Sequence, residues 1–323
     1  MSLCLLIQPI HASGIALLED AGLTVCQASK PDMETVAKEI VPAVAAITRN
    51  AGLNRAAMDA APDLKVLGNH GIGTDPVDVA HATEIGLPII FTPYGNVQSV
   101  AEFAISQMLA IARRTREADR AVRAGNYDYR YARDFVELQG KTLLVVGFGR
   151  IGCRTAEIAK AAFAMRVLAY DPYLDASVLA AAGAEKVDDL DAALDQADIV
   201  SLHLQLTPET RTIMNRDRLY GMKKGAMLVN TARGALVDAD ALIEALEDKQ
   251  LRGAAMDTFE KEPLAVEHPY AKTDRLVLSP HIGGATEECL ERTAVQTAEQ
   301  VIQVLKGIRP PYLVNPTVWD RRR

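Results

Sequence analysis

The chain has 323 residues, of which 49% are hydrophobic and 24% are charged, and its formal net charge is −7. That length suits two domains of ordinary size, and the acidic balance argues against a nucleic-acid or membrane-surface partner, because both favour basic patches. The four cysteines lack the spacing of a metal site, and no apolar run approaches the roughly 18 residues of a membrane span. We therefore expect a cytoplasmic protein with reduced thiols and no metal.

The first part of the chain alternates short apolar runs with helical patterns, which predicts a parallel sheet with crossover helices. No glycine-rich phosphate loop follows the first run, so we expect no nucleotide at that strand. The predicted strands are residues 3–7, 24–27, 44–48, 65–69 and 88–92.

Residues 96–124 contain neither proline nor glycine, and they predict one long helix leading out of the first domain. Ser99 and Glu102 form an S-x-x-E pattern, which is typical of a capping box at a helix start. An apolar stripe that begins with Val100 and Phe103 follows, so one face of this helix is expected to be buried.

A second alternating series supplies near-continuous apolar runs, the pattern of parallel strands that are buried on both faces. A last helix over residues 287–306 is expected to return to the first sheet, and the closing run Arg321–Arg323 to be a solvated, frayed tail. The predicted strands of this series are residues 142–147, 166–171, 198–204, 226–232, 253–257 and 275–280.

The sequence G-F-G-R-I-G over residues 147–152 lies directly between a predicted strand and a predicted helix. In that setting Gly147 allows the tight turn, Gly149 lets the backbone approach a pyrophosphate, and Gly152 lets helix and strand pack closely. Asp171 ends the next strand, where its carboxylate can accept hydrogen bonds from ribose hydroxyls and repel a 2′-phosphate. The sequence therefore predicts a dinucleotide site that favours NAD over NADP.

Several polar groups follow strands of this second series. Ligands collect at the carboxyl ends of strands in open parallel sheets, so we expect these groups to share one cleft. Each has a plainer explanation when taken alone: a strand cap, a surface cation, a solvated loop acid or a helix cap. The residues concerned are Gly147, Asp171, Arg233, Asp257, Glu262 and His281.

Together these groups match what hydride transfer between NAD and a hydroxy acid requires. The guanidinium of Arg233 can anchor the substrate carboxylate through two parallel hydrogen bonds. A histidine side chain can act as a base or as an acid, so His281 is the candidate for proton transfer, and Glu262 can orient its imidazole. Glu262 is preferred to Glu260 because Pro263 restricts the preceding backbone to extended geometry.

In the first domain, the loop over residues 68–74 can present backbone N–H groups to a carboxylate, although a plain turn explains the spacing equally well. Arg49 suits a phosphate or sulfonate, as in 3-phosphoglycerate or sulfolactate, and a glycerate-like acid is equally compatible. Side chains near other strand ends are candidates for the same pocket. The predicted substrate-binding residues are Arg49, Asn50, Gly71, Ile72, Gly73, Tyr94 and Arg233, with His70 and Asn96 nearby.

The chain resembles the D-isomer-specific 2-hydroxyacid dehydrogenase family over essentially its whole length. "GIGTDPVD" is similar to the branch with 3-phosphoglycerate dehydrogenase and hydroxypyruvate reductase. The resemblance implies that Arg233 binds the carboxylate, that His281 is the acid/base and that Glu262 is its partner. The matching stretches are NVQSVAE, VVGFGRIG, YDPY, LVNTARGALVD, MDTFEKEP and SPHIGGAT.

The resemblance also implies two doubly wound parallel-sheet domains, between which the chain crosses twice. A flavodoxin-like substrate domain would comprise residues 1–95 and 286–323, and a Rossmann-like NAD-binding domain residues 96–285. A homodimer is implied, held largely by the cofactor domains and the helix near Asn96. The implied dinucleotide contacts are Arg150, Ile151, Asp171, Thr231, Asp257, Gly283 and Gly284, beside Gly147, Gly149 and Gly152.

We therefore expect an oxidoreductase that moves a hydride between NAD(H) and a small D-2-hydroxy acid, with a 3-phosphoglycerate dehydrogenase-like activity as one form. Hydroxypyruvate or glyoxylate reductase and sulfolactate dehydrogenase are alternatives. Glu262 argues against the related formate dehydrogenases, which generally carry glutamine there. A rival from another class is an NAD-sensing co-repressor, which can retain the same three residues; the acidic chain without an evident disordered extension argues against it.

Overall fold

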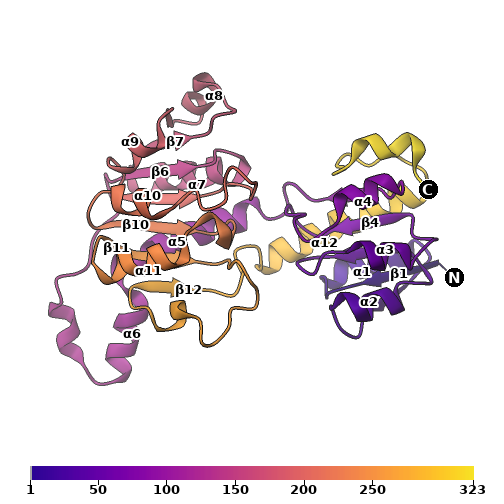
Figure 1. The fold of residues 1–323 in the computed structure, drawn as a ribbon, viewed down its shortest axis with the longest axis horizontal. Coiled ribbons are helices and arrows are strands. Elements are labelled where there is room, and N and C mark those ends of the chain that lie inside the picture. Colours follow the sequence, from indigo (N-terminus) through magenta and orange to yellow (C-terminus); the bar gives the residue numbers. More distant parts are fainter. Residues whose placement is uncertain (1) are drawn as a thin grey trace. The chain divides into compact units, whose positions relative to one another are not determined.

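The computed structural model describes residues 2–323, which form two α/β units (Figure 1). One unit comprises Met1–Asn96 and Ala285–Arg323, and the other comprises Val97–Gly284. The chain thus leaves the first unit and returns to it once. Both sheets are parallel, which confirms the predicted fold class. Among the described residues, no helix combines the length and apolar character that a membrane crossing needs.

The first unit has a five-stranded sheet in the order β2-β1-β3-β4-β5. This is the strand order of flavodoxin-like folds, in which the order reverses beside the first strand. The predicted strands are all present, with bounds shifted by one residue at most. They are β1 (Ser2–Leu6), β2 (Leu23–Gln27), β3 (Ala43–Thr48), β4 (Val66–Asn69) and β5 (Ile89–Phe91).

Helices cover both faces of this sheet. The helices α1 (Ala12–Asp20) and α12 (Glu287–Leu305) pack on one face, so the predicted return of the last helix is confirmed. Their N-terminal amides are capped by side chains, such as Thr286 at the start of α12. The opposite face is covered by α2 (Met33–Glu39), α3 (Arg55–Asp59) and α4 (Val79–Glu84).

The three arginines at the end of the chain are exposed, as predicted, but they are held on the first unit by hydrogen bonds, so the prediction of fraying is wrong. The run begins at the last residue of the 3₁₀ helix η4 (Pro316–Arg321), whose Trp319 is buried. The guanidinium of Arg322 lies 4.0 Å from the centroid of the Trp319 ring. Arg323 donates its backbone N–H to Gly86 O at 3.1 Å and its Nε–H to Leu64 O at 2.7 Å. These contacts offset the loss of conformational entropy that ordering the end of the chain requires.

The second unit has a seven-stranded sheet in the order β12-β11-β10-β9-β6-β7-β8. Numbered from β6, this is the strand order of dinucleotide-binding folds with one strand added, and the order reverses between β6 and β9. The two-residue β8 was not predicted. The strands are β6 (Thr142–Val146), β7 (Arg166–Tyr170), β8 (Glu185–Lys186), β9 (Ile199–Leu202), β10 (Ala226–Asn230), β11 (Leu251–Met256) and β12 (Leu276–Leu278).

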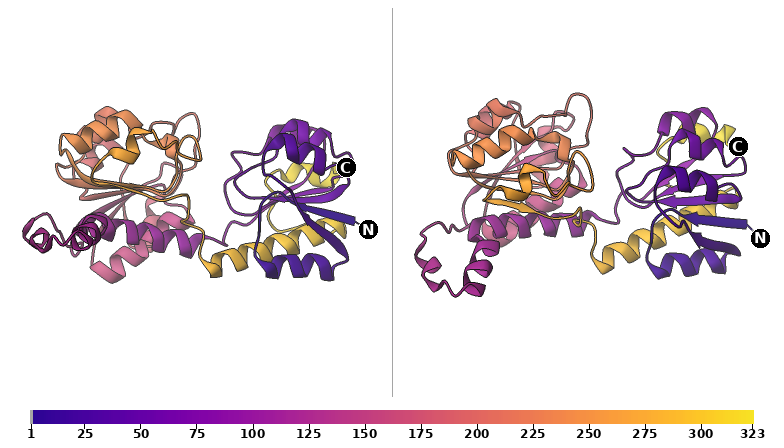
Figure 2. Two further views of the ribbon diagram at one scale, coloured as in Figure 1. Left: turned by 90° about the horizontal axis from the view of Figure 1, so that it is seen from below. Right: turned by 60° about the horizontal axis from the view of Figure 1, so that its bottom comes forward.

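Successive residues of these strands feed two separate cores, as a pleat with a period of two requires. Leu143 and Val145 of β6 pack with α5 (Val97–Arg113) and α7 (Arg150–Phe163), whereas Leu144 and Val146 face α10 (Arg216–Gly221) and α11 (Ala239–Glu247). Figure 2 shows these two sets of helices on opposite sides of the sheet. The remaining elements are α8 (Ala176–Ala181), α9 (Leu190–Leu194), η1 (Tyr127–Tyr131), η2 (Gly234–Leu236) and η3 (Pro269–Lys272).

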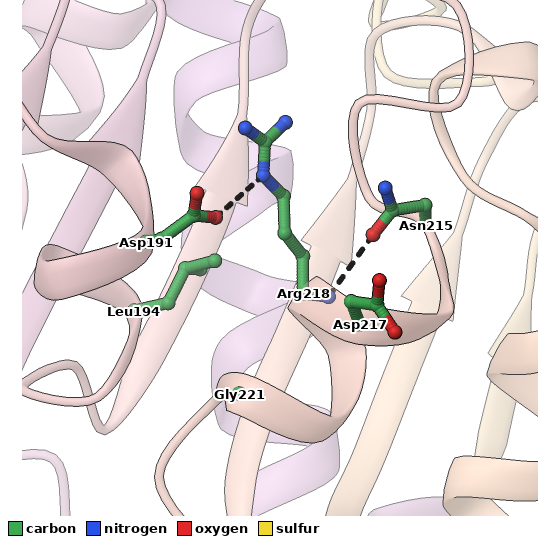
Figure 3. A pocket seen from close by; sticks show the side chains of 6 residues that line it. All are labelled: Asp191, Leu194, Asn215, Asp217, Arg218 and Gly221. Atoms are coloured by element: carbon green, nitrogen blue, oxygen red, sulfur yellow. Dashed lines mark hydrogen bonds and ion pairs between the residues drawn. The ribbon is translucent and has the colours of Figure 1, made fainter.

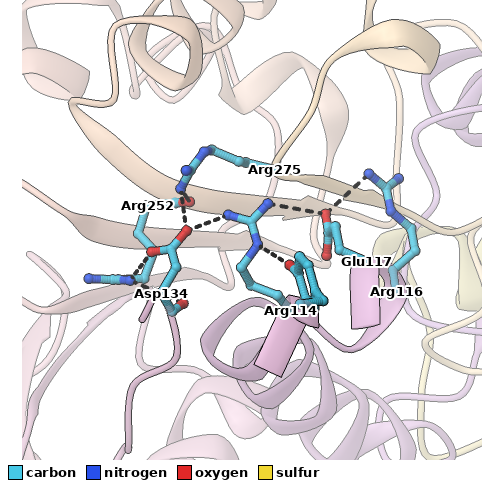
Figure 4. A network of polar contacts seen from close by, with 7 residues as sticks. Arg114, Arg116, Glu117, Asp134, Arg252 and Arg275 are labelled. Atoms are coloured by element: carbon cyan, nitrogen blue, oxygen red, sulfur yellow. Dashed lines mark hydrogen bonds and ion pairs between the residues drawn. The ribbon is translucent and has the colours of Figure 1, made fainter. Parts of the chain in front are cut away.

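The predicted long helix is broken at Arg114, which separates α5 from α6 (Thr115–Arg123). Arg114 has a φ of 49°, in the left-handed region that bulky residues rarely adopt. Its partly buried guanidinium lies 2.8 Å from Asp134 and 3.7 Å from Glu117 (Figure 4). Asp134 also pairs with Arg252 at 2.7 Å and Arg275 at 3.1 Å. This ion-pair network favours the break over continued helix.

The predicted capping box is also wrong. The helix α5 begins at Val97, so Ser99 lies inside its first turn rather than before it. Its hydroxyl donates to Gly283 O at 2.7 Å, and Glu102 instead accepts a hydrogen bond from Gln98. The Ser99 hydroxyl, which the local pattern assigned to the cap of the helix, is therefore bonded to a residue far away in the sequence.

Candidate active site

The glycine loop lies at the reversal of the strand order, between β6 and α7. Gly147 has a φ of 92°, and a Cβ there would lie 2.8 Å from His203 O. A Cβ on Gly152 would lie 2.1 Å from Gly147 O, so helix and strand approach each other too closely for any side chain. A Cβ on Gly149, by contrast, would meet nothing within 4 Å. The loop therefore has space where the backbone amides at the start of α7 are exposed to a ligand.

Asp171 follows β7 and lies against this loop. Its Oδ2 accepts the N–H of Phe148 at 2.9 Å, and its Oδ1 accepts the N–H of Tyr173 at 3.0 Å. The carboxylate is thus fixed at the glycine turn by two backbone donors. A ribose next to a phosphate on this loop would meet a negative charge, which opposes a 2′-phosphate.

The histidine and glutamate that the sequence predicts as partners are in contact. The Nδ1 of His281 lies 2.9 Å from Glu262 Oε2, and each side chain is about one-third exposed, at 33% and 32%. The other carboxylate oxygen accepts the N–H of Phe259 at 3.0 Å. With Nδ1–H donated to the carboxylate, Nε2 remains for a substrate.

Opposing effects act on the pKa of Glu262. Burial raises it, but the hydrogen bonds from His281 and from the N–H of Phe259, with the positive charges of His281 and Arg233, together lower it below its usual value. Glu262 is therefore an anion across the neutral range. It can orient the imidazole and stabilise its protonated form.

Asp257 organises the turn that carries His281. Its carbonyl accepts the N–H of His281 at 2.8 Å, and its carboxylate accepts the N–H groups of Ile282 at 2.9 Å and Gly283 at 2.8 Å. The hydroxyl of Ser279 donates to the same carboxylate at 2.6 Å. His281 itself has a φ of 56°, and these bonds hold it in that unfavourable conformation.

A similar arrangement supports Arg233. Buried Asn230, the last residue of β10, donates Nδ2–H to Arg233 O at 2.8 Å and accepts the N–H of Ala232 at 3.0 Å. A Cβ on Gly234 would lie 2.2 Å from the carbonyl carbon of Phe259, so the arginine turn lies directly on the backbone that leads to Glu262. Because of this contact, the turn that carries Arg233 and the loop that carries Glu262 are fixed relative to each other.

Thr231 is one of the predicted cofactor contacts, and the hydrogen bonding of its side chain is incomplete. Its Oγ1 is buried and meets no hydrogen-bond partner within residues 2–323. A buried hydroxyl without a partner costs free energy unless a ligand or water satisfies it. Together with the space at Gly149, it fits a site made for a polar ligand at the carboxyl edge of the sheet.

In the first unit, the predicted substrate residues follow β3 and β4. The guanidinium of Arg49 donates to Pro9 O at 3.0 Å, and Gln8 Oε1 accepts the N–H groups of Arg49 at 3.2 Å and Ala51 at 2.8 Å. Asn50 lies between these two anchored positions. Burial, and then the charge of Arg49, lower the pKa of His70 to about 4, so that imidazole is neutral.

The loop after β4 is held by buried Asn69, whose Nδ2–H groups donate to Gly71 O at 3.1 Å and Gly73 O at 3.0 Å. The loop was predicted to present its N–H groups to a carboxylate. The N–H of Gly71 instead donates to Asn69 O at 2.9 Å. Tyr94 is half-exposed, with its ring centroid 5.8 Å from that of Tyr312.

The supporting residues Asn69, Asn230 and Asp257 were not predicted in these roles. Each is a buried polar side chain at or just after the end of a strand that carries a functional loop. That placement is visible in the sequence, because an asparagine or aspartate ends or directly follows an apolar run in each case. Ser99 and Ser279 gave no such signal, because their partners lie far along the chain or on a neighbouring turn.

Other polar clusters hold none of the predicted site residues. One surface hollow is lined by residues of α9 and α10, where Arg218 pairs with Asp191 at 2.7 Å (Figure 3). Within residues 2–323, no group of three or more histidine, cysteine, aspartate or glutamate side chains is arranged to hold a metal ion.

Comparison with known proteins gives concordant matches. The family model described as D-isomer specific 2-hydroxyacid dehydrogenase, NAD binding domain, matches residues 105–283. A glyoxylate reductase of Thermofilum pendens is 44% identical over 268 residues, which is 82% of this chain and 79% of that protein. A D-3-phosphoglycerate dehydrogenase of Methanocaldococcus jannaschii is 37% identical over 311 residues, 96% of this chain but only 59% of that longer protein.

Among solved structures, the D-lactate dehydrogenase of Aquifex aeolicus complexed with NAD and lactic acid has a TM-score of 0.84 and 27% identity. The alignment covers 97% of this chain and 99% of that one. The similarity therefore extends over both units rather than over the nucleotide-binding unit alone.

Proposed function

Because this chain belongs to the D-isomer-specific 2-hydroxyacid dehydrogenase family, we propose that it interconverts a small D-2-hydroxy acid and its 2-keto acid, with His281, Glu262 and Arg233 as the catalytic residues. The matches confirm the predicted family, the NAD cofactor and the class of NAD-dependent oxidoreductases that act on CH–OH groups. The observation that carries the residue assignment is the contact of 2.9 Å between His281 Nδ1 and Glu262 Oε2.

The residues of the second unit fit NAD. The glycine loop would hold the pyrophosphate, with Arg150 and Ile151 at the first turn of α7, and Asp171 would accept the ribose hydroxyls. The orphaned hydroxyl of Thr231 supports a polar contact on the same edge. Bound NAD supplies the hydride acceptor, and NADH the donor. Asp257, Gly283 and Gly284 are the remaining proposed cofactor contacts, and the Asp257 carboxylate also accepts hydrogen bonds from the turn of His281.

His281 moves the proton. In oxidation its Nε2 takes the proton from the substrate hydroxyl, and in reduction it returns that proton to the carbonyl oxygen. Glu262 holds the ring by Nδ1 and favours the charged imidazolium that forms during oxidation. Arg233 binds the substrate carboxylate, which orients C2 for hydride transfer.

The first unit is the proposed substrate domain. In this unit the amides of Ile72 and Gly73 are the proposed contacts of the substrate carboxylate, in a loop that Asn69 holds by two hydrogen bonds. Arg49, Asn50 and Tyr94 would contact the remainder of the substrate.

Two substrate classes have specific support. The similarity to a glyoxylate reductase and the neutral state of His70 favour a small, unphosphorylated acid such as glyoxylate or hydroxypyruvate. The similarity to phosphoglycerate dehydrogenases and the guanidinium of Arg49 favour 3-phosphoglycerate, with sulfolactate as a chemical relative. The direction that dominates in the cell depends on which class is correct.

A homodimer in the cytoplasm is the proposed assembly and location. No residue of α6 is buried, and the aromatic rings of Tyr127 and Tyr131 just beyond it are exposed by 64% and 67%. Exposed aromatic rings beside a helix with no buried residue favour a protein contact. All four cysteines are free, which suits a reducing compartment. Light scattering on the wild type and on Tyr131→Glu tests the dimer: the variant should be a monomer.

The activity is tested with a stereodefined panel of 2-hydroxy and 2-keto acids, assayed with NAD(H) and NADP(H) by nicotinamide absorbance. We expect turnover of D-isomers with NAD(H). A protein that binds NADH but turns over no member of the panel would contradict the proposal and favour the co-repressor class.

A further inference from the structure

We propose that Ser99, at the start of α5, is a positioning residue for His281, acting through the carbonyl of Gly283. This inference rests on the proposed function of His281. Ser99 is 4% exposed, and its Oγ–H donates to Gly283 O at 2.7 Å. Both residues belong to the second unit, and 184 positions of the chain separate them.

The bond completes the support of the turn over residues 279–283. The three successive N–H groups of His281, Ile282 and Gly283 all donate to Asp257, at 2.8 to 2.9 Å. Asp257 follows β11, so these bonds fix the turn only to the sheet. Ser99 fixes its last carbonyl to a helix on one face of that sheet, and two independent attachments restrain a turn more than one.

Packing around Gly283 shows that helix and turn fit closely. A Cβ built on Gly283 would lie 3.1 Å from Asp257 Oδ2, 3.5 Å from Phe103 Cδ1 and 3.6 Å from Val100 Cγ2. The glycine is thus confined between the carboxylate and two side chains of α5. Movement of its carbonyl would be transmitted over two residues to His281, whose left-handed φ of 56° depends on the bonds that hold this turn.

Removing the hydroxyl should therefore loosen the imidazole without touching the substrate. We expect Ser99→Ala to lower kcat for keto-acid reduction by about 10- to 100-fold, because small misplacements of a catalytic group are costly. The KM for the keto acid should stay within about twofold, since Arg233 is unchanged. The deuterium isotope effect on kcat should increase, because the chemical step becomes slower than product release.

Ser106→Ala is the matched control. Ser106 lies on the same helix and donates to a carbonyl at the same 2.7 Å, but that carbonyl is Phe103 O within α5, and the side chain is exposed. Its kinetics should equal those of the wild type. Ser99→Cys, which keeps the shape but has a weaker donor, should fall between Ser99→Ala and the wild type, and it replaces Ser99→Ala if that variant does not fold.

A second measurement does not depend on turnover. In ¹⁵N-histidine-labelled protein, the proton between His281 Nδ1 and Glu262 should give a downfield resonance, assigned by its loss in His281→Gln. We expect it to broaden or disappear in Ser99→Ala and to persist in Ser106→Ala. An inactive wild type would refute the proposed function alone, and this resonance would still decide the role of Ser99. An unchanged resonance and kcat in Ser99→Ala, or a raised KM with unchanged kcat, would overturn the inference.

Discussion

The Nδ1 of His281 and the Oε2 of Glu262 lie 2.9 Å apart, although the two residues follow different strands and are 19 positions apart in the chain. Their turns meet because β11 and β12 are adjacent parallel strands, whose carboxyl ends share one edge. This arrangement leads to predictions for the acid, the anchor and the cofactor site.

Glu262→Gln should lower kcat by about 10- to 100-fold, because glutamine keeps the size of the side chain but cannot stabilise an imidazolium by charge. Stopped-flow measurement of NADH consumption checks this. Glu260→Gln is a suitable control, because Glu260 pairs with Arg211 at 2.8 Å and is exposed. Equal losses of kcat in the two variants would show that the negative charge of this loop supports activity, rather than the contact of Glu262 with His281.

The lowered pKa of Glu262 also predicts a pH dependence of stability. A carboxylate whose folded-state pKa is below its unfolded value stabilises the fold above the unfolded pKa, and this contribution is lost as pH falls through the folded one. The wild type should therefore unfold at a higher temperature than Glu262→Gln near neutral pH, with the difference shrinking below about pH 4.5. Calorimetry across that range measures the difference in unfolding temperature. A difference that grows as the pH falls would contradict the prediction.

Asp171→Ala should relax the preference for NAD. The carboxylate that repels a 2′-phosphate is removed, so the ratio of kcat/KM for NADP to that for NAD should rise about tenfold or more, or about 1.4 kcal/mol. Asp175→Ala provides the control, because Asp175 precedes α8 without a capping bond from its side chain. If both variants keep the wild-type ratio, Asp171 does not select the cofactor.

Arg233→Lys should chiefly impair recognition of the acid, because an ammonium ion cannot form two parallel hydrogen bonds with a carboxylate. We expect kcat/KM for the keto acid to fall by about 10²-fold or more, with little change in the dissociation constant of NADH. Fluorescence titration with NADH separates the two effects. A selective loss of NADH affinity would place Arg233 at the cofactor instead.

The sheets and the strand-end position of the site residues could be predicted because buried parallel strands have a distinct apolar pattern and their carboxyl ends meet at one edge. The break at Arg114 could not, because it depends on Asp134, Arg252 and Arg275, which lie beyond the local sequence. The S-x-x-E pattern at Ser99 misled for the same reason: a distant carbonyl was the better partner.

The docked end of the chain shows a different limit. A run of arginines has no apolar pattern, so nothing in its sequence indicates a binding partner. In the structure the partner is the ring of Trp319 together with backbone carbonyls such as Leu64 O, which are acceptors in any sequence. Such contacts can be recognised only when the surface on which the segment lies is known.

The role of His281 is tested most directly by single-turnover hydride transfer from NADH to the keto acid in His281→Gln, under saturating substrate. The rate should fall by about 10²- to 10⁴-fold, the usual contribution of a general acid, while NADH still binds. A rate within about twofold of the wild type would contradict the account, because the proton would then be supplied by another group.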